Sequence, residues 1–219
     1  MEEKSLEKKP RYTLAEELIS AISHGIGVFL SIAALVLCVV TAARHGNTIG
    51  VVGSCIYGTT LIILYTMSTL YHSFKHGTKV KSVFRIFDHC SIFLLIFGSY
   101  TPIVLSAIGG VLGWTMFGIL LALTIAGIAV NAINLEKYKK VSMFCYLLMG
   151  WMVIFTLKPA IDAVTAKGMI ILAIGGIIYT LGAIIYGVGK YIKYMHSVWH
   201  FFVLGGSIVQ FFTILWFVC

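Results

Sequence analysis

The amino-acid sequence predicts an all-α integral membrane protein with seven transmembrane helices. Hydrophobic residues make up 59% of the chain and charged residues only 11%, and the mean hydropathy is +0.98. Such values are typical of membrane proteins and exclude an ordinary soluble domain. A span needs about 20 apolar residues, so the 219 residues have room for about seven. Because backbone groups in lipid must be hydrogen-bonded within their own segment, every span should be a helix.

Polar residues precede the first apolar run, and we expect residues 1–17 to form a cytoplasmic N-terminal segment before a transmembrane domain over residues 18–219. The first run is longer than the apolar core of about 7–15 residues in a signal peptide, and other runs follow it, so we expect it to be retained. The shortest run is the fifth. The runs predict helices over residues 18–43, 48–72, 84–107, 111–133, 141–157, 167–189 and 196–218.

Lysine and arginine residues predict the orientation of these helices. The formal net charge is +8, but the charges lie in loops beside apolar spans, so we expect no nucleic-acid partner. Most cations fall on the side of the N-terminus. The positive-inside rule then places the N-terminus in the cytoplasm and, after seven crossings, the C-terminus outside a cell membrane. The cations on the N-terminal side are Lys4, Lys8, Lys9, Arg11, Lys75, Lys79, Lys81, Arg85, Lys137, Lys139, Lys140, Lys190 and Lys193, and those on the other side are Arg44, Lys158 and Lys167.

Three histidines lie at the ends of predicted spans, where an imidazole needs a reason to be present. His196 and His200 are four residues apart, so one helix presents both on the same face. The predicted topology places them at the same cytoplasmic depth as His72 and Asp88. Three imidazoles and a carboxylate form the usual ligand set of a zinc site with an open position, although other divalent ions also bind imidazole. The alternatives are that the histidines are interfacial and that Asp88 caps a helix.

Two residues near the predicted ligands are candidate catalytic groups. Ser68 lies one turn before His72, so its hydroxyl can hold the other ring nitrogen or a water on the metal. Asp88 opens the third predicted span, where it can act as a general base. We therefore expect Asp88 and Ser68 to act on the substrate beside the metal.

A second group of polar residues is expected to orient the metal ligands or to line the cytoplasmic opening of the site. Glu17, Ser20 and His24 lie near one face of the first predicted helix and enter the membrane from the cytoplasmic side. His89 follows Asp88 and points about 100° away from it on a helix, so it is expected beside the site or at a helix contact. A role for His24 as a fourth metal ligand stays open.

An open zinc site indicates chemistry, because structural sites are usually closed by four protein ligands. Zinc lowers the pKa of a bound water to about 7, and the location favours an amide or ester of a membrane lipid as the substrate. One alternative is a non-enzymatic membrane protein in which zinc is structural. Another is an ion transporter, although the predicted polar groups occupy only one leaflet. The sequence does not indicate an oligomeric state.

Four stretches of the sequence resemble the bacterial hemolysin III branch of the progestin and adipoQ receptor family. They are EELISAISHGIG, STLYHSF, FDHCSIFLLIFGSYTP and HSVWHFFVLGGSIVQFF. The resemblance implies a seven-helix fold with a cytoplasm-side zinc ion bound by His72, His196 and His200. It also implies that Asp88 holds a water on the zinc, with Ser68 nearby.

The same resemblance bears on function. The wider superfamily includes alkaline ceramidases, which implies hydrolysis of a lipid amide, whereas bacterial members are described as pore-forming hemolysins or as factors in membrane homeostasis. The chain departs from the family at two positions. Ser20 stands where asparagine is frequent, and Gln210 stands where many bacterial relatives carry histidine. Neither position belongs to the three expected ligands, and we expect Gln210 to lie deep in the last span, away from the metal.

Overall fold

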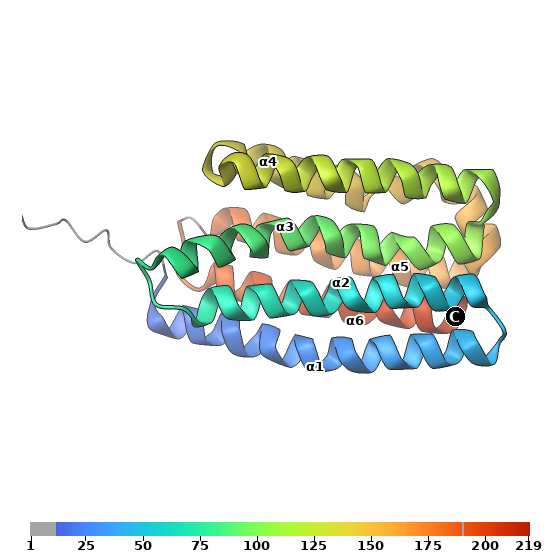
Figure 1. Cartoon of the computed structure of the whole chain (residues 1–219), viewed down its shortest axis with the longest axis horizontal. Coiled ribbons are helices and arrows are strands. Elements are labelled where there is room, and N and C mark those ends of the chain that lie inside the picture. The colour runs from blue at the N-terminus through green and yellow to red at the C-terminus, as the bar shows by residue number, and fades with distance from the viewer. Residues whose placement is uncertain (1–11, 190) are drawn as a thin grey trace, which may run out of the picture.

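The computed structural model describes residues 12–189 and 191–219, and the regular structure in these residues is helical throughout. Figure 1 shows the helices running along one long axis. Short π-helical and 3-10 turns, η1 and η2, join some of them. In chain order the elements are α1 (Leu14–Arg44), α2 (Thr48–Ser73), α3 (Lys79–Pro102), η1 (Ile103–Ile108), α4 (Gly110–Gly150), η2 (Met152–Thr156), α5 (Leu157–Val188) and α6 (Met195–Phe217).

The predicted helical class is confirmed, but the predicted count of seven separate spans is not supported. Among the described residues, five helical stretches are long and apolar enough to cross a membrane, and one of them covers Gly110–Val188. The expected break between 133 and 141 is shorter than predicted, because only Asn134 has a non-helical backbone and its side chain caps the helix that resumes directly after it. The expected break between 157 and 167 is likewise largely helical. The predicted orientation of the termini stays a prediction.

Helix α1 begins earlier than predicted. Thr13 accepts a hydrogen bond from the Glu16 amide at 3.3 Å, and the Glu16 carboxylate accepts one from the Thr13 amide at 2.8 Å. This reciprocal cap satisfies two backbone donors that a helix start leaves open. The helix therefore starts at Leu14 rather than at residue 18, and Glu17 lies inside its first turn.

Helix α4 is folded back on itself (Figure 1). Asn131 donates a hydrogen bond to the Tyr146 hydroxyl at 3.1 Å, although the two residues would be about 22 Å apart along a straight helix. The reversal lies at Asn134, whose backbone is non-helical (φ −161°, ψ 87°). The Asn134 side chain accepts a hydrogen bond from the Lys137 amide at 3.0 Å and so caps the second limb.

A second interruption lies in α5 at Thr165, where φ is 65° and ψ is 162°. A β-branched residue rarely adopts a positive φ, so the chain context must impose this bend. The Thr165 hydroxyl accepts a hydrogen bond from the Gly168 amide at 3.4 Å, as a residue preceding a new helical segment does. The described chain thus changes direction at two places inside elements that are otherwise continuously helical.

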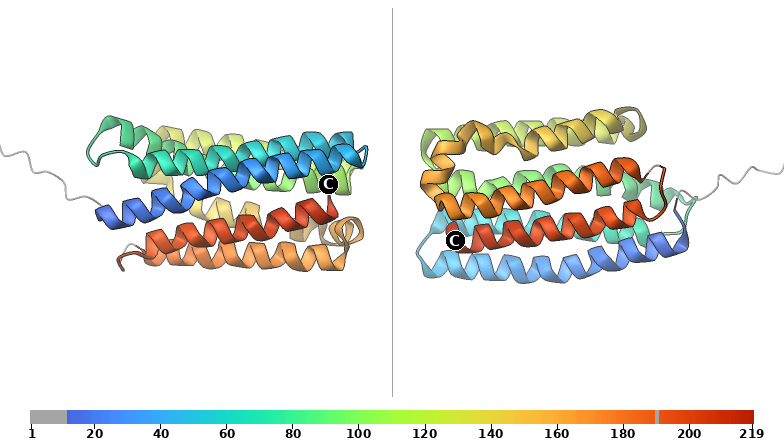
Figure 2. Two further views of the ribbon diagram at one scale, coloured as in Figure 1. Left: turned by 90° about the horizontal axis from the view of Figure 1, so that it is seen from below. Right: turned by 180° about the vertical axis from the view of Figure 1, so that it is seen from behind.

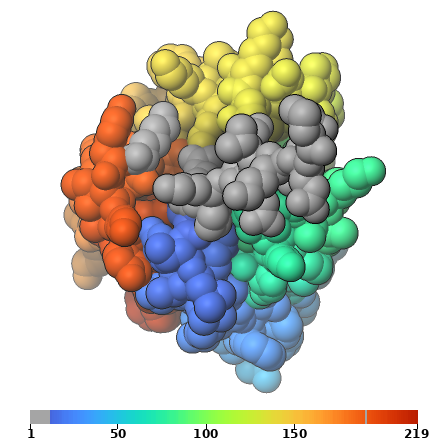
Figure 3. Space-filling view, turned by 90° about the vertical axis from the view of Figure 1, so that its left-hand side faces the viewer, coloured from blue at the N-terminus to red at the C-terminus, as the bar shows by residue number. Residues whose placement is uncertain are grey.

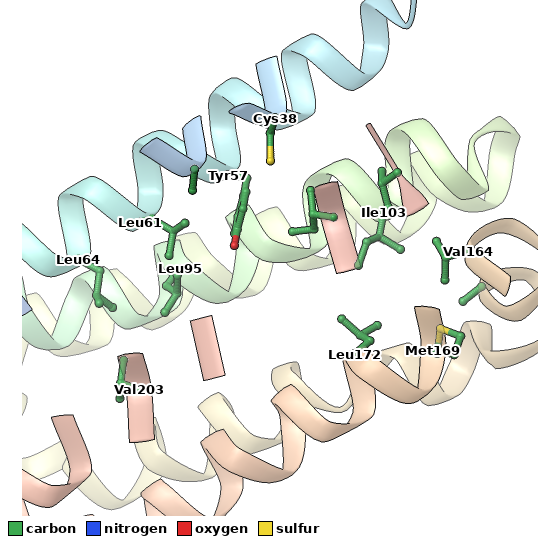
Figure 4. Packing of buried hydrophobic residues seen from close by; sticks show 14 of the residues in the cluster. Cys38, Tyr57, Leu61, Leu64, Leu95, Ile103, Val164, Met169, Leu172 and Val203 are labelled. Atoms are coloured by element: carbon green, nitrogen blue, oxygen red, sulfur yellow. The ribbon is translucent and has the colours of Figure 1, made fainter. Parts of the chain in front are cut away.

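The helices pack around an apolar interior and expose apolar side chains outward. Figure 2 shows α6 (red) between α1 (blue) and α5 (orange), and Figure 4 shows side chains of the buried cluster that joins α1, α2, α3, α5 and α6. Large exposed side chains such as Phe29, Val111 and Phe155 cover the outer surface. A protein that is apolar both inside and outside is adapted to lipid, and the chain is a multi-pass membrane protein.

Close helix contacts bring several chain segments to one end of the molecule. A Cβ atom on Gly27 would lie 2.5 Å from the Tyr65 ring, so glycine is required where α1 approaches α2.

Figure 3 looks onto the end of the molecule where α1 begins and shows the start of α1 (blue), the start of α3 (green), the bend of α4 (yellow) and the end of α5 (orange). The histidines of the predicted metal site lie toward this end.

Candidate metal centre

Three buried imidazoles from two helices converge at this end of the molecule. His72 lies in the last turn of α2, and His196 and His200 lie in the first two turns of α6. Their exposed fractions are 4%, 6% and 2%. One nitrogen from each ring lies within 4.8 Å of the others. The Nε2 atom of His196 is 3.4 Å from that of His72 and 3.3 Å from that of His200. The structure thus brings together the three residues predicted as metal ligands.

The hydrogen bond that Glu17 accepts from His72 fits a metal ion at the other ring nitrogen. The His72 Nδ1 atom donates a hydrogen bond to the Glu17 carboxylate at 2.6 Å, which leaves the Nε2 lone pair directed at the other two histidines. The Nε2 atom of His196 faces the Nε2 atoms of both His72 and His200. A neutral ring nitrogen either donates one hydrogen bond or accepts one, so hydrogen bonds among the three rings leave at least one of these nitrogens without a partner. Three neutral imidazoles are a frequent ligand set for zinc, and the residues present therefore fit this ion.

A buried lysine that the sequence analysis treated only as a loop charge supports this arrangement. Lys81, which is 7% exposed, contacts the second oxygen of Glu17 at 2.9 Å and donates to the Phe74 carbonyl oxygen at 2.9 Å. Lys81 therefore fixes the carboxylate that fixes His72. Its position in a basic connection gave no sequence signal for this role, because burial depends on where α1 places Glu17.

Tyr12 and Glu16 also contribute to the site and were missed from the sequence. The Tyr12 ring stacks on the His196 ring with centroids 4.4 Å apart. Glu16, besides capping α1, accepts a hydrogen bond from the Tyr194 amide at 2.7 Å just before α6. The spacing of Thr13 and Glu16 is that of a capping box, which could have identified Glu16 from the sequence.

Asp88, Ser68 and His89 line one small cavity with His196 and His200. The cavity volume is about 40 Å³, enough for a small number of water molecules. His89 lies beside Asp88, with its Nδ1 atom 3.4 Å from the carboxylate, and donates to the Arg85 carbonyl oxygen at 2.9 Å. The two predicted catalytic residues therefore share a water-sized space with two of the histidines.

The two remaining predicted residues differ in their placement. The Ser20 hydroxyl lies 3.2 Å from that of Ser197, so Ser20 joins α1 to α6 beside the ligand helix. His24 lines the small cavity, and its ring centroid is 3.9 Å from that of His200. Neither ring nitrogen of His24 has a hydrogen-bond partner within the described chain. His24 is not among the converging nitrogens, and its role as a fourth ligand stays a prediction.

Two larger apolar cavities adjoin the small one, and the larger of them opens to the outer surface beside exposed side chains such as Ile154 and Ile170. The first, of about 100 Å³, shares Leu64, Trp199 and Val203 with the small cavity. The second, of about 320 Å³, shares Tyr100 and Gln210 with the first. Apolar walls beside a polar site are typical of pockets that bind a small hydrophobic molecule.

Comparisons with known proteins assign the chain to a family. The sequence profile described as "Haemolysin-III related" matches residues 12–211, which include every residue of the site described above. The chain belongs to the haemolysin-III-related family. It is 42% identical over 214 residues to "Hemolysin-3" of Bacillus cereus, with 97% of each chain covered. It is 41% identical over 206 residues to "Hemolysin-3 homolog" of Bacillus subtilis (strain 168), with 94% of this chain and 96% of the relative covered.

A more distant relative extends the family beyond bacteria. The chain is 29% identical over 166 residues to "Monocyte to macrophage differentiation factor" of Homo sapiens, which covers 73% of this chain and 67% of the relative. The resemblance to hemolysin III and to the wider receptor family, predicted from four sequence stretches, is confirmed.

Proposed function

We propose that this haemolysin-III-related protein is a zinc-dependent hydrolase of a lipid amide or ester at the cytoplasmic leaflet. The observation that carries the proposal is the convergence of three buried imidazole nitrogens within 4.8 Å of one another. Two of these histidines line a small cavity together with Asp88 and Ser68. The adjoining apolar cavities offer space for the hydrocarbon part of a lipid, which supports a lipid rather than a water-soluble substrate.

We further propose that the chain crosses the membrane seven times with its N-terminus in the cytoplasm. The reversal at Asn134 and the interruption at Thr165 divide the stretch Gly110–Val188 into shorter helical segments, which supports this count. The distribution of lysine and arginine supports the orientation. In this arrangement the histidines lie just below the cytoplasmic surface.

Each residue of the proposed site has a distinct task. His72, His196 and His200 would hold zinc, which when bound supplies a Lewis acid and lowers the pKa of water. Asp88 accepts a proton from water and later returns it to the leaving nitrogen or oxygen. The Ser68 hydroxyl orients water or the substrate carbonyl in the same small cavity.

Glu17 and the apolar cavities complete the proposed mechanism. Glu17 holds His72 in the tautomer whose Nε2 atom can bind a metal. The apolar walls bind the lipid chain and keep bulk water away from the reacting bond. Binding of the chain in this way positions the amide or ester bond at the histidines.

The experiment that tests this proposal compares His200→Ala with His76→Ala. His200 is buried in the cluster, whereas His76 is exposed in the α2–α3 connection, so both variants lose one imidazole but only one loses a candidate ligand. Purified proteins are assayed for zinc content and for release of fatty acid from ceramides, phospholipids and acylglycerols. We expect the wild type and His76→Ala to bind zinc and turn over one lipid class, and His200→Ala to lose both properties. Turnover of no lipid class by zinc-loaded wild type contradicts the proposal.

A second candidate function is cytolysis, which the name "Hemolysin-3" of the relative from Bacillus cereus favours. In this case zinc would only stabilise the helices. The same variants separate the two functions. Lysis of red blood cells by folded, zinc-free His200→Ala at the wild-type level would favour the cytolytic function over hydrolysis.

A further inference from the structure

Gln210 is a polar residue at the junction of the two larger apolar cavities. It lies in α6, and its side chain lines both the cavity of about 100 Å³ and the cavity of about 320 Å³. No hydrogen bond joins its amide to another residue in the described part of the chain. An amide without a partner at membrane depth costs free energy, so its presence calls for a partner that the protein itself does not supply.

The other polar side chains that line both cavities are already hydrogen-bonded. The Tyr100 hydroxyl donates to the Gly150 carbonyl oxygen at 2.8 Å, and the Trp151 indole donates to the Thr180 hydroxyl at 3.1 Å. Ser99 donates to the Leu95 carbonyl oxygen at 2.8 Å. Gln210 is therefore the lining side chain whose donors and acceptor are open to a bound molecule.

Close packing holds the Gln210 side chain at the cavities. A Cβ atom added to Gly175 would lie 2.7 Å from the Gln210 Cγ atom, so the stem of the glutamine rests directly against the backbone of α5. A larger residue at position 175 would push the glutamine away. The glycine therefore allows α5 and α6 to approach with the amide kept between them.

The distance from Gln210 to the histidines is set by helix geometry. Val203, which lines the small cavity and its neighbour, lies two turns before Gln210 and on the same face of α6. Along the axis of α6, His200 and Gln210 are about 15 Å apart. An extended hydrocarbon chain needs roughly 12 carbon–carbon bonds of about 1.5 Å to cover this distance along its zigzag.

We propose that Gln210 forms a binding site for an oxygen atom in the middle of a long lipid chain. The ligand class is a long-chain fatty acyl compound that carries a hydroxyl or keto oxygen about 12 carbons from its carbonyl group. The amide donates to a keto oxygen, and it can both donate to and accept from a hydroxyl. The position of the carbonyl end at the histidines rests on the proposed function, whereas the recognition by Gln210 rests on the cavities and on the amide without a partner.

Equilibrium binding to purified, full-length protein in detergent tests this proposal with defined probes. The probes are octadecanoate, 12-hydroxyoctadecanoate and 2-hydroxyoctadecanoate, which differ only in the presence and place of one hydroxyl group. We expect the 12-hydroxy acid to bind about fivefold to tenfold more tightly than the other two, because one hydrogen bond to the amide contributes a difference of this size. Equal affinities for the three acids would overturn the proposal, and this comparison needs only the wild-type protein.

Two variants assign the preference to the glutamine. Gln210→Met keeps a similar volume without the amide, and we expect it to bind the 12-hydroxy acid and octadecanoate equally. Thr213→Val is the control, because Thr213 is also a polar residue of α6 without a hydrogen-bond partner in the described chain, and it lines neither cavity. The control should keep the wild-type preference. A preference that persists in Gln210→Met refutes the role of Gln210.

The hydrolase proposal and this inference can fail separately. If the wild type prefers the 12-hydroxy acid but hydrolyses no lipid, the hydrolase proposal fails and the Gln210 site stands. If the protein hydrolyses lipids but binds the three acids equally, the Gln210 site fails and the hydrolase proposal stands.

Discussion

Replacement of Glu17 by glutamine tests the link between the carboxylate and the proposed metal site. The Glu17 oxygens contact His72 Nδ1 at 2.6 Å and Lys81 Nζ at 2.9 Å. A glutamine keeps the size of the side chain but loses the charge that pairs with Lys81 and strengthens the hydrogen bond from His72. Loss of a carboxylate behind a metal-binding histidine lowers metal affinity by roughly 10-fold to 100-fold. We therefore expect Glu17→Gln to bind zinc more weakly by about 1.4–2.7 kcal/mol.

The same substitution should destabilise the protein even without metal. Lys81 is buried, and removal of its anionic partner leaves an uncompensated charge. Breaking a buried ion pair in this way lowers the free energy of unfolding by about 3–5 kcal/mol. Because Glu17 is partly exposed, we expect a loss of about 3 kcal/mol or less. Lys81→Met should restore part of this loss in the double variant, because the charge that lacks a partner is then absent.

Zinc affinity is measured by competition with a chromophoric chelator, and stability by thermal unfolding of the metal-free protein in detergent. Glu136→Gln is the matched control, because Glu136 pairs with Arg85 near the same end of the molecule but is exposed and lies outside the histidine cluster. We expect the control to bind zinc as the wild type does. Wild-type zinc affinity in folded Glu17→Gln would refute the assigned role of the carboxylate.

Three further predictions follow from other contacts. Tyr12→Ala removes the ring stacked on His196, and about 1 kcal/mol of packing over this ligand is lost. We therefore expect zinc to dissociate about threefold to tenfold faster when its release to a chelator is followed over time. Tyr191→Ala, at an exposed tyrosine, should leave this dissociation rate unchanged. Asn131→Leu removes the hydrogen bonds of Asn131 that join the two limbs of α4. We expect the free energy of unfolding, measured by thermal unfolding, to fall by about 2–3 kcal/mol. An unchanged melting temperature would contradict the inferred strength of this contact. Gln210→Met removes an amide without a partner in the described chain. In the same assay we expect the free energy of unfolding of the ligand-free protein to rise by about 1 kcal/mol. A lower stability would indicate that the amide already has a partner.

The helical class and the meeting of the three histidines could be predicted from the sequence. The four-residue spacing of His196 and His200 identifies a shared helix face, and the positions of lysine and arginine indicate which helix ends lie together. His72 could be joined to this pair only through the predicted topology, since no local pattern connects residues so far apart.

Other features could not be predicted because they depend on contacts between distant segments. The hydropathy pattern marks a polar break near Asn134 but cannot show that helix resumes at the next residue, where the asparagine side chain caps the new limb. Lys81 has the sequence surroundings of an ordinary loop cation, and its burial arises only when α1 supplies a carboxylate. The apolar cavities likewise result from the packing of several helices and leave no signal in any one of them.

The division of the histidines between α2 and α6 has a consequence for biogenesis. Helix α6 follows all the other described helices, so two of the three imidazoles leave the ribosome after nearly all of the membrane domain has been synthesised. An insertion intermediate that lacks α6 has His72 alone, and one imidazole retains a divalent ion poorly. Metal capture at the proposed site would therefore begin only after α6 has docked, and bound metal would mark chains in which α2 and α6 are packed together.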